Sequence, residues 1–170
     1  MSYCYIEAPN YVELPKDQPS IFLGGITGVE DWQLKARNVL SGVGNITIVN
    51  PRRVNFDMNA GPELSYEQIK WEHHYLDRVH QVVFWFSNET IQPIVLFELG
   101  ARLREYKWRP KYGMVGGKQP MFIGYHRDYN RKMDVYQQAR LEGYTDEFPE
   151  TLDDLLQKVL TFNRLYKLIH

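Results

Sequence analysis

A single acidic residue, Glu98, interrupts an otherwise apolar segment of the 170-residue chain. The segment 94–101 has the sequence IVLFELGA, and every other residue in it is apolar or small. Burying an unpaired carboxylate is strongly unfavourable, so such a glutamate is either paired with a base or retained for chemistry. An ion pair with Arg102, one helical turn further along, is the structural alternative.

A second acidic residue, Glu72, falls on the apolar face of a helix predicted over residues 64–80. That face carries Ile69, Leu76 and Val79 at helical spacing. Two carboxyl groups at one site suit reaction at an acetal-like carbon, where one attacks the sugar and the other moves a proton on the leaving group. The alternative is a partly exposed glutamate at the edge of the apolar face.

No metal or cofactor signature accompanies these acids. His73 and His74 are adjacent, so on a helix they point to different sides, and the chain has no HExxH motif. The glycines of GGITG at 24–28 match neither a GxGxxG fingerprint nor a phosphate-binding P-loop. We therefore expect no metal and no cofactor.

Short apolar runs alternate with helical patterns along the chain. Strands are predicted over 20–26, 45–49, 81–86 and 120–125, and helices over about 30–42, 64–80, 93–107, 130–141 and 151–168. Continuous apolar strands separated by helices are typical of a parallel sheet covered on both faces. We predict one α/β domain over 1–170, with residues 1–19 as an irregular lead-in. Its fold would be a flavodoxin-like three-layer sandwich with four to five parallel strands, the predicted strands lying in the order 2-1-3-4.

The predicted topology places the reactive site. Ligands of such sheets bind at the carboxyl ends of the strands, where the strand order reverses. Here these are the loops after the first and third predicted strands, which contain residues 24–27 and 88–92, and Glu98 follows the second of them. Trp85 and Phe86 end the third strand, and at most one of the two can face a ligand.

Composition excludes several classes of partner. The chain has 20 basic and 21 acidic residues and a net charge of -1, so neither nucleic acid nor a membrane surface is an expected partner. The single cysteine, Cys4, allows no internal disulfide and suits the cytoplasm. No apolar run approaches the roughly 20 residues of a membrane span, and the start of the chain does not resemble a signal peptide.

An ordered set of short motifs resembles a known superfamily. It consists of IFLGGITG, DWQ, NPRR with a following FD, QIKWE, VVFWF and PIVLFELG, and covers roughly residues 20–135. The set resembles the nucleoside 2-deoxyribosyltransferases, in particular their nucleoside 2-deoxyribosyltransferase-like branch. The resemblance implies cleavage of the N-glycosidic bond of a 2'-deoxynucleoside and transfer of the sugar to another base. It also implies a homo-oligomer built on dimers, with nucleosides and free nucleobases as its small-molecule partners.

The resemblance also assigns roles to individual residues. Glu98 matches the glutamate that attacks C1' and forms the deoxyribosyl-enzyme intermediate. Glu72 falls where the family has an aspartate that helps move the proton of the base. Gln92 replaces an aspartate that holds sugar hydroxyls in many members, and Phe22 replaces a tyrosine that orients the nucleophile. Further substrate contacts are expected from Gly24, Gly25, Ile26, Asn50, Arg52, Asp57, Trp85 and Asn88.

Two other functions are open from the sequence. A nucleoside or nucleotide N-glycosidase would hand the sugar to water, and Arg52 with Arg53 would then hold a 5'-phosphate. The structural alternative for Arg52 and Arg53 is an ion pair with Asp57 or Glu72. The third hypothesis is a binding module that has lost catalysis. It is favoured by Phe22 and Gln92, which stand in place of the family's tyrosine and aspartate.

Overall fold

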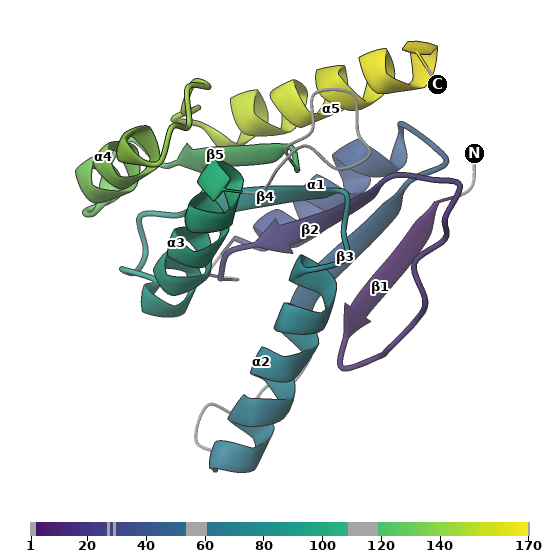
Figure 1. The fold of residues 1–170 in the computed structure, drawn as a ribbon, viewed down its shortest axis with the longest axis horizontal. Coiled ribbons are helices and arrows are strands. Elements are labelled where there is room, and N and C mark those ends of the chain that lie inside the picture. The colour runs from purple at the N-terminus through teal and green to yellow at the C-terminus, as the bar shows by residue number, and fades with distance from the viewer. Residues whose placement is uncertain (1–2, 27, 29, 54–60, 109–118, 170) are drawn as a thin grey trace.

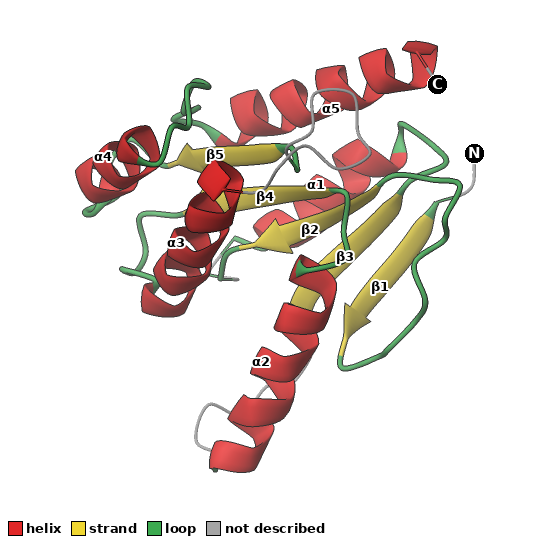
Figure 2. Cartoon of the chain, viewed as in Figure 1, coloured by secondary structure: helices red, strands yellow, loops and turns green. Residues whose placement is uncertain are grey.

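Five parallel strands form one sheet in the computed structural model, which describes residues 3–26, 28, 30–53, 61–108 and 119–169. The strands are β1 (Cys4–Ala8), β2 (Ser20–Gly24), β3 (Thr47–Arg53), β4 (Gln81–Phe86) and β5 (Met121–Tyr125). Their order is β1-β3-β2-β4-β5 (Figure 2). The four strands predicted from the sequence therefore lie in the predicted order, and the flavodoxin-like sandwich is confirmed.

Helices cover both faces of this sheet. They are α1 (Trp32–Ser41), α2 (Pro62–Leu76), α3 (Pro93–Trp108), α4 (Lys132–Leu141) and α5 (Leu152–Ile169). Buried side chains of α2, α3 and α4 form one core with one face of the strands, and those of α1 and α5 form a second core with the other face. Figure 1 shows α2 and α3 crossing one side of the sheet, with α1 on the far side.

Successive strand residues divide between the two cores. In β4 every residue is buried, and Phe84 and Phe86 join the core under α2 and α3 while Val83 and Trp85 join the core under α1 and α5. This division follows from the period of two along a strand. The end of β4 therefore contributes side chains to both helical layers.

Residues 1–19 are not wholly irregular, so that expectation is wrong. Residues 4–8 form the edge strand β1, which pairs with β3 in the register Cys4↔Thr47 and Ile6↔Val49. Only Ile6 and Ala8 of this strand are buried in the core. A five-residue edge strand with two buried residues is held mainly by pairing, and therefore leaves little hydrophobic pattern in the sequence.

The helix that carries Glu72 is shorter than predicted. It ends at Leu76, so Val79 lies beyond it, and Ile69 is 42% exposed. Leu76 and Val79 are buried as expected, whereas the assignment of Ile69 to the buried face is wrong. None of the helices in the described segments is both long enough and apolar enough to cross a membrane.

Two glycines let β2 end close against β4. A Cβ on Gly24 would lie 2.7 Å from the ring of Phe84. A Cβ on Gly25 would lie 2.6 Å from the carbonyl oxygen of Trp85, and the φ of Gly25 is +151°, which residues with a side chain rarely adopt. At the point where the strand order reverses, Gly24 is thus required by the Phe84 ring and Gly25 by the backbone of β4.

Replacing Gly25 should therefore destabilise the fold. We expect Gly25→Ala to lower the free energy of unfolding by about 1–3 kcal/mol, because the methyl group meets backbone at an unfavourable φ. Urea unfolding followed by circular dichroism measures the change. Gly61→Ala is the control, since a Cβ on this exposed glycine meets no atom within 4 Å. Equal stability of Gly25→Ala and wild type would contradict this interpretation.

Candidate active site

Glu72 and Glu98 meet on the face of the sheet that α2 and α3 cover. Glu72 lies in the second half of α2 and Glu98 in the second turn of α3. Both residues are half-buried, and their carboxyl groups are hydrogen-bonded to each other. Since a carboxylate has no hydrogen to donate, this contact requires a proton on one of the two groups. The fold therefore brings together the two acids that the sequence singled out.

Burial and like charge keep this proton on the pair. The pKa of Glu98 is raised from 4.5 to about 8. Burial of the carboxyl group makes the largest contribution, and the negative charge of Glu72 and the hydrogen bond to Glu72 add to it. Burial also raises the pKa of Glu72, while hydrogen bonds from Gln68 and Glu98 and the charge of His73 oppose the rise. The higher pKa belongs to Glu98, so the last proton of the pair is held toward neutral pH mainly on Glu98.

Arg102 forms its ion pairs with residues other than Glu98. Its guanidinium donates to Asp77 Oδ1 at 2.6 Å and to Glu105 Oε2 at 2.8 Å. Its positive charge lowers the pKa of Glu98, but this effect is smaller than those of burial and Glu72. The ion pair offered as the structural explanation of Glu98 is therefore directed to two other acids.

Gln92 ties together the two loops at the reversal of strand order. Its Oε1 accepts a hydrogen bond from the backbone N–H of Ile26 at 3.3 Å. Its Nε2 donates to the carbonyl oxygen of Ser87 at 3.3 Å and to Ser87 Oγ at 3.2 Å. Gln92 is 1% exposed, and its backbone φ is +55°. Gln92 thus fixes the exit of β2 to the exit of β4, directly before α3.

Phe22 lies in the core on the same side of the sheet as the acid pair. It is fully buried, and its ring centroid lies 6.4 Å from that of Trp71. A phenyl ring offers no hydrogen bond to Glu98, and the carboxyl of Glu72 makes that contact instead. Ile26 is partly buried against the same core.

Two predicted substrate contacts at the end of β3 are engaged within the protein. The buried Asn50 donates through Nδ2 to the hydroxyl of Tyr5 at 2.7 Å and accepts the backbone N–H of Arg52 at 3.0 Å. Arg52 forms an ion pair with Asp31, the residue that caps α1, and not with Glu72. Asp57, the other predicted contact, lies outside the described residues.

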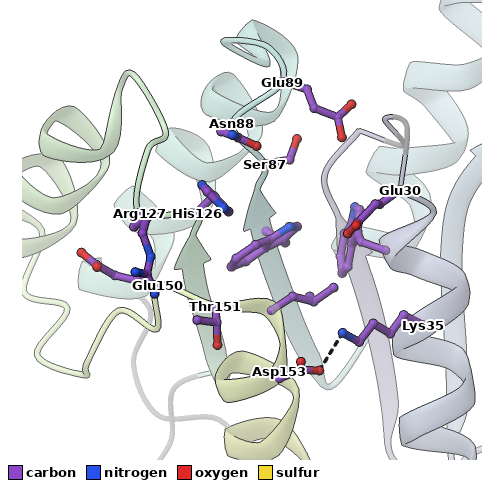
Figure 3. Close-up of a pocket in the computed structure, with 13 residues that line it drawn as sticks. Glu30, Lys35, Ser87, Asn88, Glu89, His126, Arg127, Glu150, Thr151 and Asp153 are labelled. Atoms are coloured by element: carbon purple, nitrogen blue, oxygen red, sulfur yellow. Dashed lines mark ion pairs between the residues drawn. The ribbon is translucent and has the colours of Figure 1, made fainter.

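Trp85 and Asn88 line a separate cleft of about 500 Å³. Trp85 belongs to the core under α1 and α5, on the opposite face of the sheet from the acid pair. Figure 3 shows Asn88, His126 and Arg127 on one side of this cleft and Glu30 on the other, with Lys35 paired to Asp153 at 2.7 Å. The structure therefore separates Trp85 from Glu72 and Glu98.

One residue of the site was missed in the sequence. Gln68 donates from Nε2 to Glu72 Oε1 at 2.8 Å, and it stands one helical turn before Glu72. The i, i+4 spacing within QIKWE was the available signal, since polar residues at this spacing meet on a helix surface. Among the described residues, no group of three or more His, Cys, Asp or Glu side chains is placed to hold a metal ion.

The raised pKa of Glu98 predicts how stability depends on pH. The unfolded chain releases this proton near pH 4.5, whereas the folded pair keeps it to about pH 8. The folded state binds more protons in this interval, so stability should fall as pH rises from 5 to 8, by the order of a few kcal/mol. Urea unfolding midpoints at several pH values measure the decline.

Glu98→Gln supplies the control for this pH dependence. The amide keeps the shape of the side chain but cannot ionise, so the decline between pH 5 and 8 should become much smaller. Identical pH dependence of the variant and the wild type would show that the proton is not held as the structure indicates.

Comparison with known families finds a match. A family model described as nucleoside 2-deoxyribosyltransferase like matches residues 18–108, which is more than half of the chain. This span contains β2, β3, β4, α2 and α3, and thus both acids. No curated protein sequence matches the chain. Because the family model matches more than half of its residues, the chain belongs to the nucleoside 2-deoxyribosyltransferase-like family.

Proposed function

We propose that the protein transfers the 2'-deoxyribosyl group of a nucleoside to another nucleobase through a covalent sugar ester of Glu98. The observation that carries this proposal is the hydrogen-bonded pair of half-buried carboxyl groups at the carboxyl end of a parallel sheet. The family match supports the substrate class, a nucleoside and a free base. The proposed chemistry uses the two carboxyl groups and needs no cofactor.

The pair can perform both halves of such an exchange. Glu98 passes its proton to Glu72, and the resulting carboxylate attacks C1' of the sugar. The C1'–N bond breaks, its electrons go to the base, and Glu72 delivers the proton to the base nitrogen. The second base reverses these steps, giving its proton to Glu72 while its nitrogen takes the sugar from Glu98.

The closeness of the carboxyl groups favours this double displacement. In inverting glycosidases the two acids stand about 6.5–9.5 Å apart to admit water, whereas in retaining enzymes they are about 5 Å apart. The direct contact between the carboxyl groups of Glu72 and Glu98 leaves no room for a water molecule between them, which argues against the wider spacing. The arrangement therefore supports attack by Glu98 itself over activation of a water molecule.

The contacts of Arg52 weaken the case for a monophosphate glycosidase. That reading required Arg52 and Arg53 to hold a 5'-phosphate, but Arg52 is paired with Asp31. An unphosphorylated nucleoside is thus the better substrate for the described residues. The raised pKa of Glu98 and its contact with Glu72 likewise favour catalysis over a binding module.

We propose that two copies of the chain pair through α3. Ile91, Ile94 and Phe97 are 52%, 58% and 78% exposed, and Gly100 and Ala101 continue this exposed apolar face. Small residues let a second helix approach closely, and large exposed apolar patches mark interfaces. A second copy fits here because covering this face would exclude water beside Glu98, as sugar transfer requires.

The single cysteine suits a cytoplasmic place for this reaction.

Base exchange tests the proposed activity. The purified protein is incubated with a purine deoxynucleoside and a second free base, and the new nucleoside is measured by chromatography. Glu98→Gln should lower the exchange rate by about a thousandfold or more, because the attacking group is lost. Glu67→Gln, an exposed acid of α2, is the matched control and should retain the wild-type rate.

The same reaction separates the alternatives. Intact-protein mass spectrometry of the acid-quenched wild type should show one added deoxyribosyl group, absent from Glu98→Gln. Free sugar without any acceptor base would favour the glycosidase instead. Binding of the nucleoside with neither exchange nor hydrolysis would identify a binding module.

Light scattering tests the proposed dimer. Phe97→Glu should reduce the measured mass from that of a dimer to that of a monomer, because a buried charge disrupts an apolar interface. Leu34→Glu, a similar change at a 48% exposed position on α1, should leave the dimer intact. A wild-type protein that is monomeric at tens of micromolar would rule out this interface.

A further inference from the structure

The Gln68 side chain links the acid pair to the sheet. It is half-buried on α2, and its Nε2 donates to Glu72 Oε1 at 2.8 Å and to the carbonyl oxygen of Pro51 at 2.7 Å. Pro51 belongs to β3, against which α2 lies (Figure 1). One amide group therefore contacts a catalytic acid on the helix and the backbone of the strand beside it.

The Pro51 carbonyl fixes the direction of this amide. A carbonyl oxygen only accepts hydrogen bonds, so turning the amide over would bring Gln68 Oε1 against the oxygens of both Pro51 and Glu72. Gln68 Oε1 is buried and has no hydrogen-bond partner among the described residues. A buried acceptor without a partner is unfavourable, so the two donated bonds determine the orientation. Gln68 is thus a fixed donor toward Glu72.

We propose that Gln68 is a positioning residue that directs the shared proton of the acid pair onto Glu98 by holding an N–H donor against Glu72. A hydrogen bond from an amide stabilises a charged carboxylate more than a neutral carboxyl group. The donor therefore selects the arrangement in which Glu72 is ionised and Glu98 holds the proton. This assignment goes beyond the family match and rests on the proposed function only for its catalytic consequence.

The same donor acts again when the sugar is transferred. Glu98 gives its proton to Glu72 and forms a bond to C1', the C1'–N bond breaks, and the base nitrogen takes the proton from Glu72. Glu72 is then ionised once more, opposite the N–H of Gln68. Gln68 thus stabilises ionised Glu72 both before and after transfer, and opposes its transient protonation in between.

Other charged groups around the pair act differently. His73 on α2 affects Glu72, and Arg102 on α3 affects Glu98, through their charges alone. Arg102 is directed to Asp77 and Glu105, and Arg52 on β3 is paired with Asp31. Within the described residues, Gln68 is the donor to Glu72 that is not itself titratable. Its effect on the proton should therefore persist across the whole titration.

Gln68→Met tests the proposal, because methionine keeps the length of the side chain and removes the donor. The titration of the two carboxyl groups is followed by carbon-13 NMR of glutamate-labelled protein, with Glu72→Gln and Glu98→Gln used for assignment. The first ionisation step, in which Glu72 loses its proton, should move to higher pH in Gln68→Met, whereas the second step, at Glu98, should move little. Gln137→Met, the same change at an exposed position of α4, should titrate like the wild type.

A second readout follows the location of the shared proton. In the singly protonated pair near neutral pH, the carbon-13 shifts should show more of the proton on Glu72 in Gln68→Met than in the wild type, since ionised Glu72 has lost its donor. The acidic limb of the pH profile of base exchange should move upward with the NMR titration. A side chain that merely filled space would change neither the titration nor this distribution in the folded variant.

The outcomes separate this proposal from the proposed function. An unchanged titration in a folded Gln68→Met protein would overturn the role of Gln68, whatever the activity. If Gln68→Met does not fold, Gln68→Asn replaces it, since its shorter side chain cannot reach both oxygens and should shift the titration the same way. A shifted titration in a protein that exchanges no bases would retain the role of Gln68 and reject the transferase.

Discussion

One shared proton between Glu72 and Glu98 is the constraint on which the rest of the site depends. Two ionised carboxylates in contact at a half-buried position repel each other, and two neutral acids offer no nucleophile. The singly protonated pair has both an attacking oxygen and a proton to move. The burial of the two carboxyl groups, the raised pKa of Glu98 and the hydrogen bond between the groups therefore depend on one another.

The fold positions this pair by connecting the helix of each acid to different strands. Gln68 connects the helix of Glu72 to the end of β3 through the carbonyl of Pro51. Gln92 connects the start of α3, which carries Glu98, to the exits of β2 and β4. Because these strands are neighbours in a rigid sheet, the distance between the two helices is set by backbone pairing and not by the acids themselves.

The sequence was sufficient where burial leaves a pattern and insufficient where contacts are long-range. Continuous apolar strands revealed the sheet and its order, and Glu98 within IVLFELGA marked the site. The edge strand β1 buries only Ile6 and Ala8, so it left no such mark. The partner of Arg52 is Asp31, the N-cap of α1, which is about as far from Arg52 along the chain as Glu72, so spacing in the sequence does not choose between these two acids. Trp85 was placed at the right strand end, but the strand period alone does not identify which face holds Glu72 and Glu98.

The amide of Gln92 suits a site with a single proton between two acids. An aspartate here, as the resemblance leads one to expect, would add a third negative charge at the start of the helix that carries Glu98. It would also lack the N–H groups that Gln92 donates to Ser87, so the two loops would be joined by acceptors alone. The neutral amide both donates to Ser87 and accepts from Ile26. Position 92 is thus part of the scaffold that orients α3, and the charge of the site is concentrated on the pair that we propose carries out the chemistry.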